Sequence, residues 1–348
     1  MRAPKISFEE SLEKVVLAKK CMGCAACVVV CPLTCLEYSQ ERPKIVKTCE
    51  ACGICPRVCP RYDWSWSALE KFVFERERKP EEDFGIYRRI AIAQATDKNT
   101  LEVCQDGGVV TALLAFALEN GIIEGAAVSG IRQDKPFYPV PRLATTQQEV
   151  LQCAGTRYSY SPNLLAFQEG VKLKKKSLAF VGTPCQIHAI RKIQMVPLRK
   201  YADPLKFTVG LMCTESFTYD GLMEKQIQES LGINLHDVKK INIKAKILIT
   251  TKSGEVKTIP LPEAKQYTRK SCTICDDFSA ELADISAGGL GLSGWTFTIL
   301  RTKKGEEIFE EAEKRGLLKT RSVEEEKKAL DLLVRLSKRK RTVLSLTQ

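Results

Sequence analysis

The chain has 348 residues, of which 44% are hydrophobic and 28% are charged. This composition is typical of a globular protein and excludes a disordered chain, and the length suggests more than one domain. The formal net charge is +12, but no run of basic residues interleaved with aromatics indicates a nucleic-acid groove. The count also treats each cysteine as neutral, so buried anionic metal clusters would balance part of the basic excess.

Residues 1–20 include acidic side chains and lack a continuous apolar stretch, so they are not a signal peptide. No apolar run is long enough to span a bilayer, and we expect a cytoplasmic protein. The chain contains fifteen cysteines and two histidines, His188 and His236. In a reducing compartment so many cysteines indicate metal binding or redox chemistry, and soft thiolate ligands favour iron–sulfur clusters or zinc.

The N-terminal segment contains two similar cysteine runs. Residues 21–32 read CMGCAACVVVCP, and residues 49–60 read CEACGICPRVCP. Both follow the bacterial ferredoxin pattern C-x2-C-x2-C-x3-C-P, at an offset of 28 (49 − 21). The repeat predicts two related halves joined by a pseudo-twofold axis. Because zinc sites do not use two tandem sets of four cysteines at identical spacing, the pattern favours iron–sulfur clusters.

In this motif the fourth cysteine of each run ligates the cluster of the other run. The spacing therefore predicts two [4Fe-4S] clusters, one held by Cys21, Cys24, Cys27 and Cys59, the other by Cys49, Cys52, Cys55 and Cys31. We expect Gly23 and Gly53 to let the backbone turn closely about the metal. Cys35, just beyond the first run, is expected to be a small buried apolar residue.

Residues 62–82 are typical of a helix that runs into a charged tether and stops at Pro80. Beyond the tether, strand patterns alternate with helix patterns. We expect strands at 88–96, 125–131, 177–182, 206–213, within 238–262 and near 295–302, and helices at 107–121, 149–154, 163–173, 183–194, 219–232, 305–316 and 322–340. The predicted fold is an α+β ferredoxin-like two-cluster domain with a linker helix, residues 1–80, fused to an α/β domain with a mixed sheet, residues 81–348.

Three further features leave alternatives open. Cys185, Cys213, Cys272 and Cys275 are scattered, and a C-x-x-C pair alone could be a zinc half-site, a redox dithiol or coincidence. In residues 105–108, QDGG, Asp106 could cap a helix whose N-terminus binds a phosphate, or could be an ordinary cap. Residues 155–163, GTRYSYSPN, suit a polar ligand or an ordinary loop, and the basic residues 335–341 suit a solvated helix end or a docking surface.

Taken together, these segments resemble the beta-subunit family of coenzyme F420 hydrogenases and dehydrogenases. The pieces that carry the resemblance cover most of residues 100–302: QDGGVVTALLAFALENGIIEGAAVSG, AGTRYSYSPN, GTPCQ, GLMCTESF, CTICDDFSAELADIS and SGWTFTILRT. The fusion to two ferredoxin runs resembles the electron-input subunit, designated F, of the archaeal reduced-F420:quinone or methanophenazine oxidoreductase, which is a membrane assembly.

The resemblance implies that the large domain is flavin-binding, that coenzyme F420 docks against the FAD, and that Cys185, Cys213, Cys272 and Cys275 hold a third [4Fe-4S] cluster. The implied FAD-binding residues are Gln105, Asp106, Gly107, Gly108, Thr111, Gly155, Thr156, Arg157, Tyr158, Ser161, Asn163, Thr183 and Pro184. Cys104 and Cys153 fall on no cluster position and are expected to be structural. Basic residues such as Arg157, Arg191 and Lys192 could attract the anionic tail of coenzyme F420.

The chemistry that the resemblance implies is hydride transfer from reduced coenzyme F420 to FAD, followed by release of single electrons to the clusters. It requires no catalytic acid–base pair or activated nucleophile, and the sequence contains no clear candidate for either. Expected partners are subunits of a membrane-bound, complex I-like oxidoreductase, which would hold the chain on the inner face of the membrane. The alternatives are the F420-reactive subunit of a hydrogenase or formate dehydrogenase, a polyferredoxin without catalysis of its own, and a nucleic-acid-binding protein with structural clusters.

Overall fold

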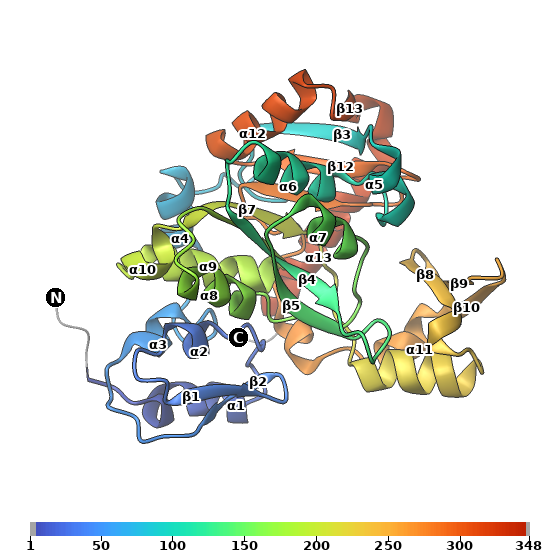
Figure 1. Ribbon diagram of the computed structural model, residues 1–348. Helices are drawn as coiled ribbons and strands as arrows, with labels where there is room; N and C mark the ends of the chain where they lie inside the picture. The colour runs from blue at the N-terminus through green and yellow to red at the C-terminus, as the bar shows by residue number, and fades with distance from the viewer. Residues whose placement is uncertain (1–4, 346–348) are drawn as a thin grey trace.

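The computed structural model of the protein describes residues 5–345, and Figure 1 shows their arrangement. The N-terminal segment contains η1 (Glu9–Glu13), α1 (Lys14–Leu17), α2 (Ala26–Val30), β1 (Leu36–Ser39), β2 (Arg42–Ile45), α3 (Ile54–Val58) and α4 (Trp66–Phe74). Strands β1 and β2 form an antiparallel hairpin. No helix in the described part of the chain is long and apolar enough to cross a membrane.

The two cysteine runs adopt the same backbone conformation. Helices α2 and α3 occupy equivalent positions at the offset of 28, and each ends where the fourth cysteine of its run becomes extended. Two equivalent positions in each run have a left-handed backbone: Gly23 (φ 72°) and Ala51 (φ 49°), then Ala25 (φ 66°) and Gly53 (φ 67°). The sequence repeat is therefore also a structural repeat, although each half places its single glycine at a different one of the two positions.

An eight-stranded mixed sheet forms the centre of the large domain. Its strands are, in spatial order, β13 (Leu318–Arg321), β3 (Arg89–Ala95), β12 (Thr296–Leu300), β11 (Ile285–Gly288), β7 (Leu205–Leu211), β6 (Leu178–Gly182), β4 (Gly125–Ile131) and β5 (Pro139–Ala144). The neighbouring pairs from β11 through β7 and β6 to β4 are parallel, and the outer pairs are antiparallel.

Alternating residues along the strands supply two hydrophobic cores, one on each face of the sheet. Ala126 and Val128 of β4 pack on the face that α6 (Val109–Glu119) and α12 (Lys303–Lys314) cover. Ala127 and Phe180 point to the opposite face, which α8 (Leu164–Lys172) and α9 (Pro184–Met195) cover. Helix α13 (Lys327–Ser345) packs on Ile92 and Phe297 at the far end of the sheet.

The remaining elements connect these layers. They are α5 (Lys98–Val103), α7 (Gln147–Gln152), α10 (Arg199–Ala202), the π-type helix η2 (Asp220–Ser230), η3 (Leu235–Asp237), α11 (Leu261–Lys265), η4 (Lys270–Ile274) and η5 (Val323–Glu326). A separate antiparallel sheet contains β8 (Val238–Ile243), β9 (Lys246–Thr251) and β10 (Val256–Pro260). It extends to one side of the molecule in Figure 1.

The expected mixed α/β architecture is confirmed, with corrections in detail. The linker helix α4 ends at Phe74, before Glu75 with its left-handed backbone (φ 61°), and not at Pro80. Strand β5 was missed because its prolines are typical of loops, yet it lies at the edge of the sheet, where a missing N–H is tolerated. The short strands β11 and β13 and helix α5 were also missed.

The N-terminal segment packs directly on the large domain, below α8 and α9 in Figure 1. Val30, Val58 and Leu69 belong to the same hydrophobic core as Phe167 and Ile190. Because apolar side chains from both parts are buried in one core, the two parts are held in a fixed relation. A domain boundary near residue 80 stays a prediction.

Candidate cofactor and cluster sites

Cysteines of the two N-terminal runs are electrostatic neighbours of one another. Burial raises the pKa of the Cys24 thiol, and the nearby Cys59 raises it further. Burial likewise raises the pKa of Cys55 to about 12, with contributions from Cys52, Cys49 and Cys31. The fourth cysteine of each run therefore lies near the first three cysteines of the other run.

The second set, Cys31, Cys49, Cys52 and Cys55, lines a small cavity. Cys52 is exposed, and all the residues that line the cavity belong to the N-terminal segment. Cys35 also lines this cavity, is 4% exposed and donates its thiol hydrogen to the carbonyl oxygen of Thr48 at 3.2 Å. Its burial agrees with the expected structural role.

The four scattered cysteines of the large domain meet in a second small cavity. Cys185 stands in the first turn of α9, Cys213 follows β7, and Cys272 and Cys275 lie in and after η4. Met22, from the first cysteine run, also lines the cavity. Burial raises the pKa of all four thiols, so they must lose protons to bind a metal. No group of three or more His, Cys, Asp or Glu side chains in residues 5–345 surrounds a single-ion site.

Two cationic side chains line this second cavity. Arg269 lies over the Tyr160 ring at 4.0 Å, pairs with Glu41 at 2.8 Å and donates to the carbonyl oxygen of Met22 at 3.1 Å. It therefore links the cavity to the N-terminal segment. The other cation is Lys340, from a basic stretch for which the sequence suggested a solvated helix end.

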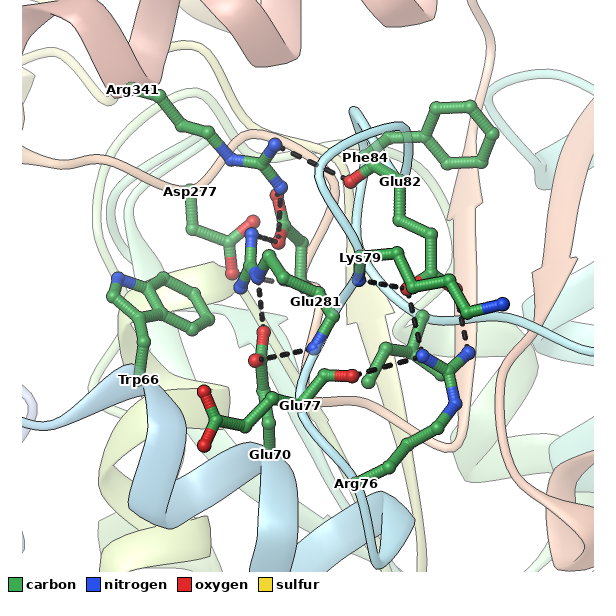
Figure 2. Close-up of polar contacts among 12 residues, drawn as sticks. Trp66, Glu70, Arg76, Glu77, Lys79, Glu82, Phe84, Asp277, Glu281 and Arg341 are labelled. Carbon is green, nitrogen blue, oxygen red and sulfur yellow. Dashed lines mark hydrogen bonds and ion pairs between the residues drawn. The ribbon is translucent and has the colours of Figure 1, made fainter.

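The interpretation of residues 335–341 as a solvated helix end is wrong for part of the segment. Lys340 is only 7% exposed, and Arg341 pairs with the buried Glu281 at 2.7 Å. Figure 2 shows Arg341 and Glu281 beside Glu70 of α4. Arg78 bridges Glu70 and Glu281, so these charges join the linker, the loop that follows Cys275 and the C-terminal helix.

An aromatic group next to this network was also absent from the sequence interpretation. Trp66 donates from Nε1 to Asp276 at 2.6 Å, and His188 of α9 stacks on Trp64 with ring centroids 4.3 Å apart. Nε2 of His188 lies 2.9 Å from Asp277. These contacts fix the residues that follow Cys275 against the linker. No local sequence signal predicts them, because the partners are more than eighty residues apart.

The QDGG segment lies next to the first part of GTRYSYSPN. A Cβ on Gly155 would lie 3.4 Å from the carbonyl oxygen of Val103, and the charge of Asp106 raises the pKa of Tyr158, for which burial is the main cause. Gln105 donates to the carbonyl oxygen of Ile241 at 3.1 Å. The two segments predicted to bind one cofactor therefore lie close together beside the three-stranded sheet.

Gly107 and Gly108 lead directly into α6. A Cβ on Gly107 would come within 2.5 Å of the carbonyl oxygen of Ala93, and Gly108 has a left-handed backbone (φ 72°) as the residue before the helix. The thiol of Cys104 donates to the carbonyl oxygen of Asp106 at 2.9 Å, which supports its structural role. The predicted Asp106 cap is not observed, because Gly108 occupies the cap position.

The predicted cofactor residues differ in their burial and their neighbours. Ser161 and Asn163 are buried and bonded to each other at 2.7 Å, and Asn163 also donates to the carbonyl oxygen of Val181 at 2.8 Å. Thr183 and Pro184 line the cavity of the four cysteines. Thr111 is 8% exposed within α6, whereas Gly155 and Thr156 are more accessible.

The three predicted anion-attracting residues differ in availability. Arg191 is buried against Asp284 at 3.0 Å, and Lys192 is buried and donates to the carbonyl oxygens of Cys59 and Asp63. Neither is free to bind a ligand. Arg157 donates to two carbonyl oxygens of its own loop, but its buried Nε has no partner within the described residues.

Two family models match most of the large domain. Residues 90–168 match the N-terminal model of the coenzyme F420 hydrogenase/dehydrogenase beta subunit, and residues 175–326 match the C-terminal model of the same protein. The coenzyme F420 hydrogenase subunit beta of Methanothermobacter thermautotrophicus is 42% identical over 74% of this chain and 92% of that protein. A component of the F(420)H(2) dehydrogenase of Methanosarcina mazei, designated F, is 34% identical over 59% of this chain and 58% of that protein.

A chain in a solved structure of the F420-reducing [NiFe] hydrogenase complex from Methanosarcina barkeri has a TM-score of 0.74. It is 37% identical, and the match covers 78% of this chain and 94% of that chain. The protein therefore belongs to the coenzyme F420 hydrogenase/dehydrogenase beta-subunit family, a family of F420-dependent oxidoreductase subunits. Residues 5–89, with both ferredoxin-type runs, lie outside the matched family models.

Proposed function

We propose that this chain is the coenzyme F420-reactive subunit of a hydrogenase- or dehydrogenase-type enzyme, and that it binds FAD and three [4Fe-4S] clusters. Two clusters would belong to a ferredoxin-like N-terminal domain, with the ligand sets given above. The third would be held by Cys185, Cys213, Cys272 and Cys275. In this arrangement, electrons would pass from the flavin in the large domain through the third cluster to the two N-terminal clusters, and leave the chain there.

The observation that carries the proposal is the second cavity. Cysteines from three distant segments line it, and Met22 of the first run forms part of its wall. Cys24 and Cys185 are also close enough for the charge of one to raise the pKa of the other, after the larger effect of burial. A polyferredoxin without catalysis would not require a large domain whose cysteines converge next to the ferredoxin-type segment.

The donor sets fit iron–sulfur clusters, because each consists of four thiols, and all of these thiols except that of Cys52 are at least partly shielded from solvent. The region around QDGG fits a flavin nucleotide. Arg157 has a buried Nε without a partner among the described residues, and it would hold a phosphate oxygen. FAD, when bound, would convert two-electron hydride chemistry into single-electron transfer. The chain's own residues would orient the cofactor, and Tyr158 and Gln105 would lie between it and the three-stranded sheet.

For the partner, the similarities favour a hydrogenase or formate dehydrogenase over a quinone or methanophenazine reductase. The hydrogenase beta subunit matches over nearly its whole length, whereas the F(420)H(2) dehydrogenase component matches over 58%. The second candidate rests on the two fused ferredoxin-type runs, which the electron-input component of the membrane-linked enzymes is expected to share. Attachment to the inner face of a membrane through partner subunits would follow only from this second candidate.

Iron and flavin content test the proposal directly. The anaerobically purified chain should contain about twelve irons and one FAD and should pass electrons from reduced coenzyme F420 to a dye. Replacing Cys213 by alanine should remove about four irons, while Cys153→Ala, which changes a cysteine outside all three sets, should leave the iron content unchanged. A wild-type chain with about eight irons, no flavin and no turnover would overturn the assignment of the large domain.

A further inference from the structure

Lys340 is a buried cation at the second cavity. It lies in α13, beyond residue 326, where the matched family models end. Its Nζ is 3.5 Å from the carbonyl oxygen of Cys272, and the side chain lines the same cavity as the four cysteines. The family resemblance therefore does not account for this charge.

No carboxylate neutralises Lys340 directly. Among residues 5–345, none of its contacts is an ion pair of 4.0 Å or less, whereas Arg269 in the same cavity pairs with Glu41 and the adjacent Arg341 pairs with Glu281. Burial alone would lower the pKa of Lys340, but the charges of Cys275, Cys213, Cys272 and Glu215 together outweigh burial and raise it. A buried cation is costly unless an anion compensates it, and the groups near Lys340 that can carry negative charge are these three cysteines and Glu215.

We propose that Lys340 sets the reduction potential of the cluster held by Cys185, Cys213, Cys272 and Cys275, by favouring its reduced state electrostatically. The inference rests on the proposed function, which supplies the cluster and its reductant, reduced coenzyme F420. Reduction adds one electron to an already anionic site, and a fixed positive charge at the cavity wall stabilises the more negative state. Lys340 neither gains nor loses a proton in this step. Net charge near a cluster is one of the factors that set its potential.

The geometry separates Lys340 from its neighbours on the same helix. The Lys338 side chain is 60% exposed and pairs with Asp83 at 3.0 Å, so solvent screens its charge. Replacing Lys338 by glutamine is therefore a matched control for removing one positive charge from α13. Lys340→Arg keeps the charge in the cavity and forms a second control.

The test is a redox titration of the clusters monitored by electron paramagnetic resonance, with iron content measured in parallel. The signal of the third cluster is assigned by its loss in Cys213→Ala. In K340Q this signal should remain, with the equilibrium constant for reduction at least tenfold lower, which is 59 mV for a one-electron couple. K340R and K338Q should stay within threefold of wild type, and the two N-terminal clusters should not shift.

Each other result has a definite meaning. A third cluster present in K340Q with an unchanged potential, or an equal shift in K338Q, would overturn the inference while leaving the proposed function intact. Lys340→Met keeps a side chain of similar length without a charged group, and it should lower the reduction potential of the third cluster as K340Q does. If both K340Q and K340M lose the third cluster, Lys340 is needed to retain the cluster, and the inference about its potential is also overturned. A wild-type protein without a third signal would refute the proposed function itself.

Discussion

Arg269 should hold the N-terminal segment against the large domain, and Arg269→Gln tests this. Its side chain is 8% exposed and makes three contacts: an ion pair with Glu41, a hydrogen bond to Met22 and a stacking contact with Tyr160. Because the Glu41 carboxylate is 42% exposed, that ion pair contributes little beyond solvent-screened attraction. The charged hydrogen bond contributes about 1.5–3 kcal/mol, and the cation–π contact roughly 0.5–2 kcal/mol.

Allowing for non-additivity, we expect R269Q to weaken local docking by about 3 kcal/mol. Since each 1.4 kcal/mol is a factor of ten, local opening of the N-terminal segment should increase about one-hundredfold. Hydrogen–deuterium exchange measured by mass spectrometry on the anaerobic, cluster-loaded protein reports such opening. Peptides that cover 21–45 should exchange faster, while peptides of the central strands β11 and β12 should not.

The matched control is Lys257→Gln, which removes one exposed ion pair with Glu255 in the separate three-stranded sheet. It should change exchange in neither region. Equal protection of residues 21–45 in R269Q and wild type would refute the reasoning, because it would mean that the shared hydrophobic core alone holds the segment. Faster exchange throughout the chain would refute it in a different way, by showing that Arg269 supports the whole fold.

The remaining predictions concern the core and the flavin site. Asp284→Asn should lower the free energy of unfolding by about 3–5 kcal/mol, because it leaves Arg191 buried without its partner; urea titration would measure this, and a loss below about 1 kcal/mol would contradict it. Burial tends to raise the pKa of Asp284, but Arg191 and other partners lower it overall. The contribution of the ionised Asp284 to stability is therefore present above the unfolded pKa, near 3.9, and should be lost as the pH falls through the lower folded value. In acid titrations, D284N should lack this part of the pH dependence of stability. Gly107→Ala should disturb the start of α6, because its Cβ would lie 2.5 Å from the Ala93 carbonyl oxygen, and lower thermal stability would show it. Arg157→Met should reduce FAD content without reducing iron content, and unchanged flavin binding would remove Arg157 from the site.

The elements that the sequence predicted well have strong and local signals. Strand β4 was expected at 125–131 and has those bounds, because a run of small apolar residues lies between glycines. Strand β5 was missed, since Pro139 and Pro141 are acceptable only at a sheet edge. The identity of an edge strand is a property of the assembled sheet, and no local pattern contains it.

The same limit applies to the sites. The pairing of the N-terminal cysteines follows from the ferredoxin pattern, because the motif itself fixes which cysteine reaches which set. The set that includes Cys185 and Cys213 required the family resemblance, since its members are separated by long stretches of sequence. Arg269 has no sequence signal, because its partners lie in another part of the chain.

Lys340, in contrast, had a signal that the charge run obscured. Ala329, Leu333, Ser337 and Lys340 follow one another at helical spacing, and all four are buried. The presence of five basic residues in 335–341 suggested a solvated end, but composition does not determine which face of a helix a residue occupies. Extending the helical spacing of the buried residues through the basic run would have placed Lys340 on the buried face of the helix.

The basic excess of the chain is partly an internal property. Lys192, Arg269 and Lys340 are all buried, and each has a cysteine of one of the proposed sets among its electrostatic neighbours. Without metal, the nearby thiols have raised pKa values and remain largely protonated, so these cysteines would not compensate the three cations. Cluster binding would replace thiol protons by a buried negative charge. Folding of these regions and cluster loading should therefore stabilise each other. The three buried cations contribute because Coulombic attraction to the clusters is least screened in the protein interior.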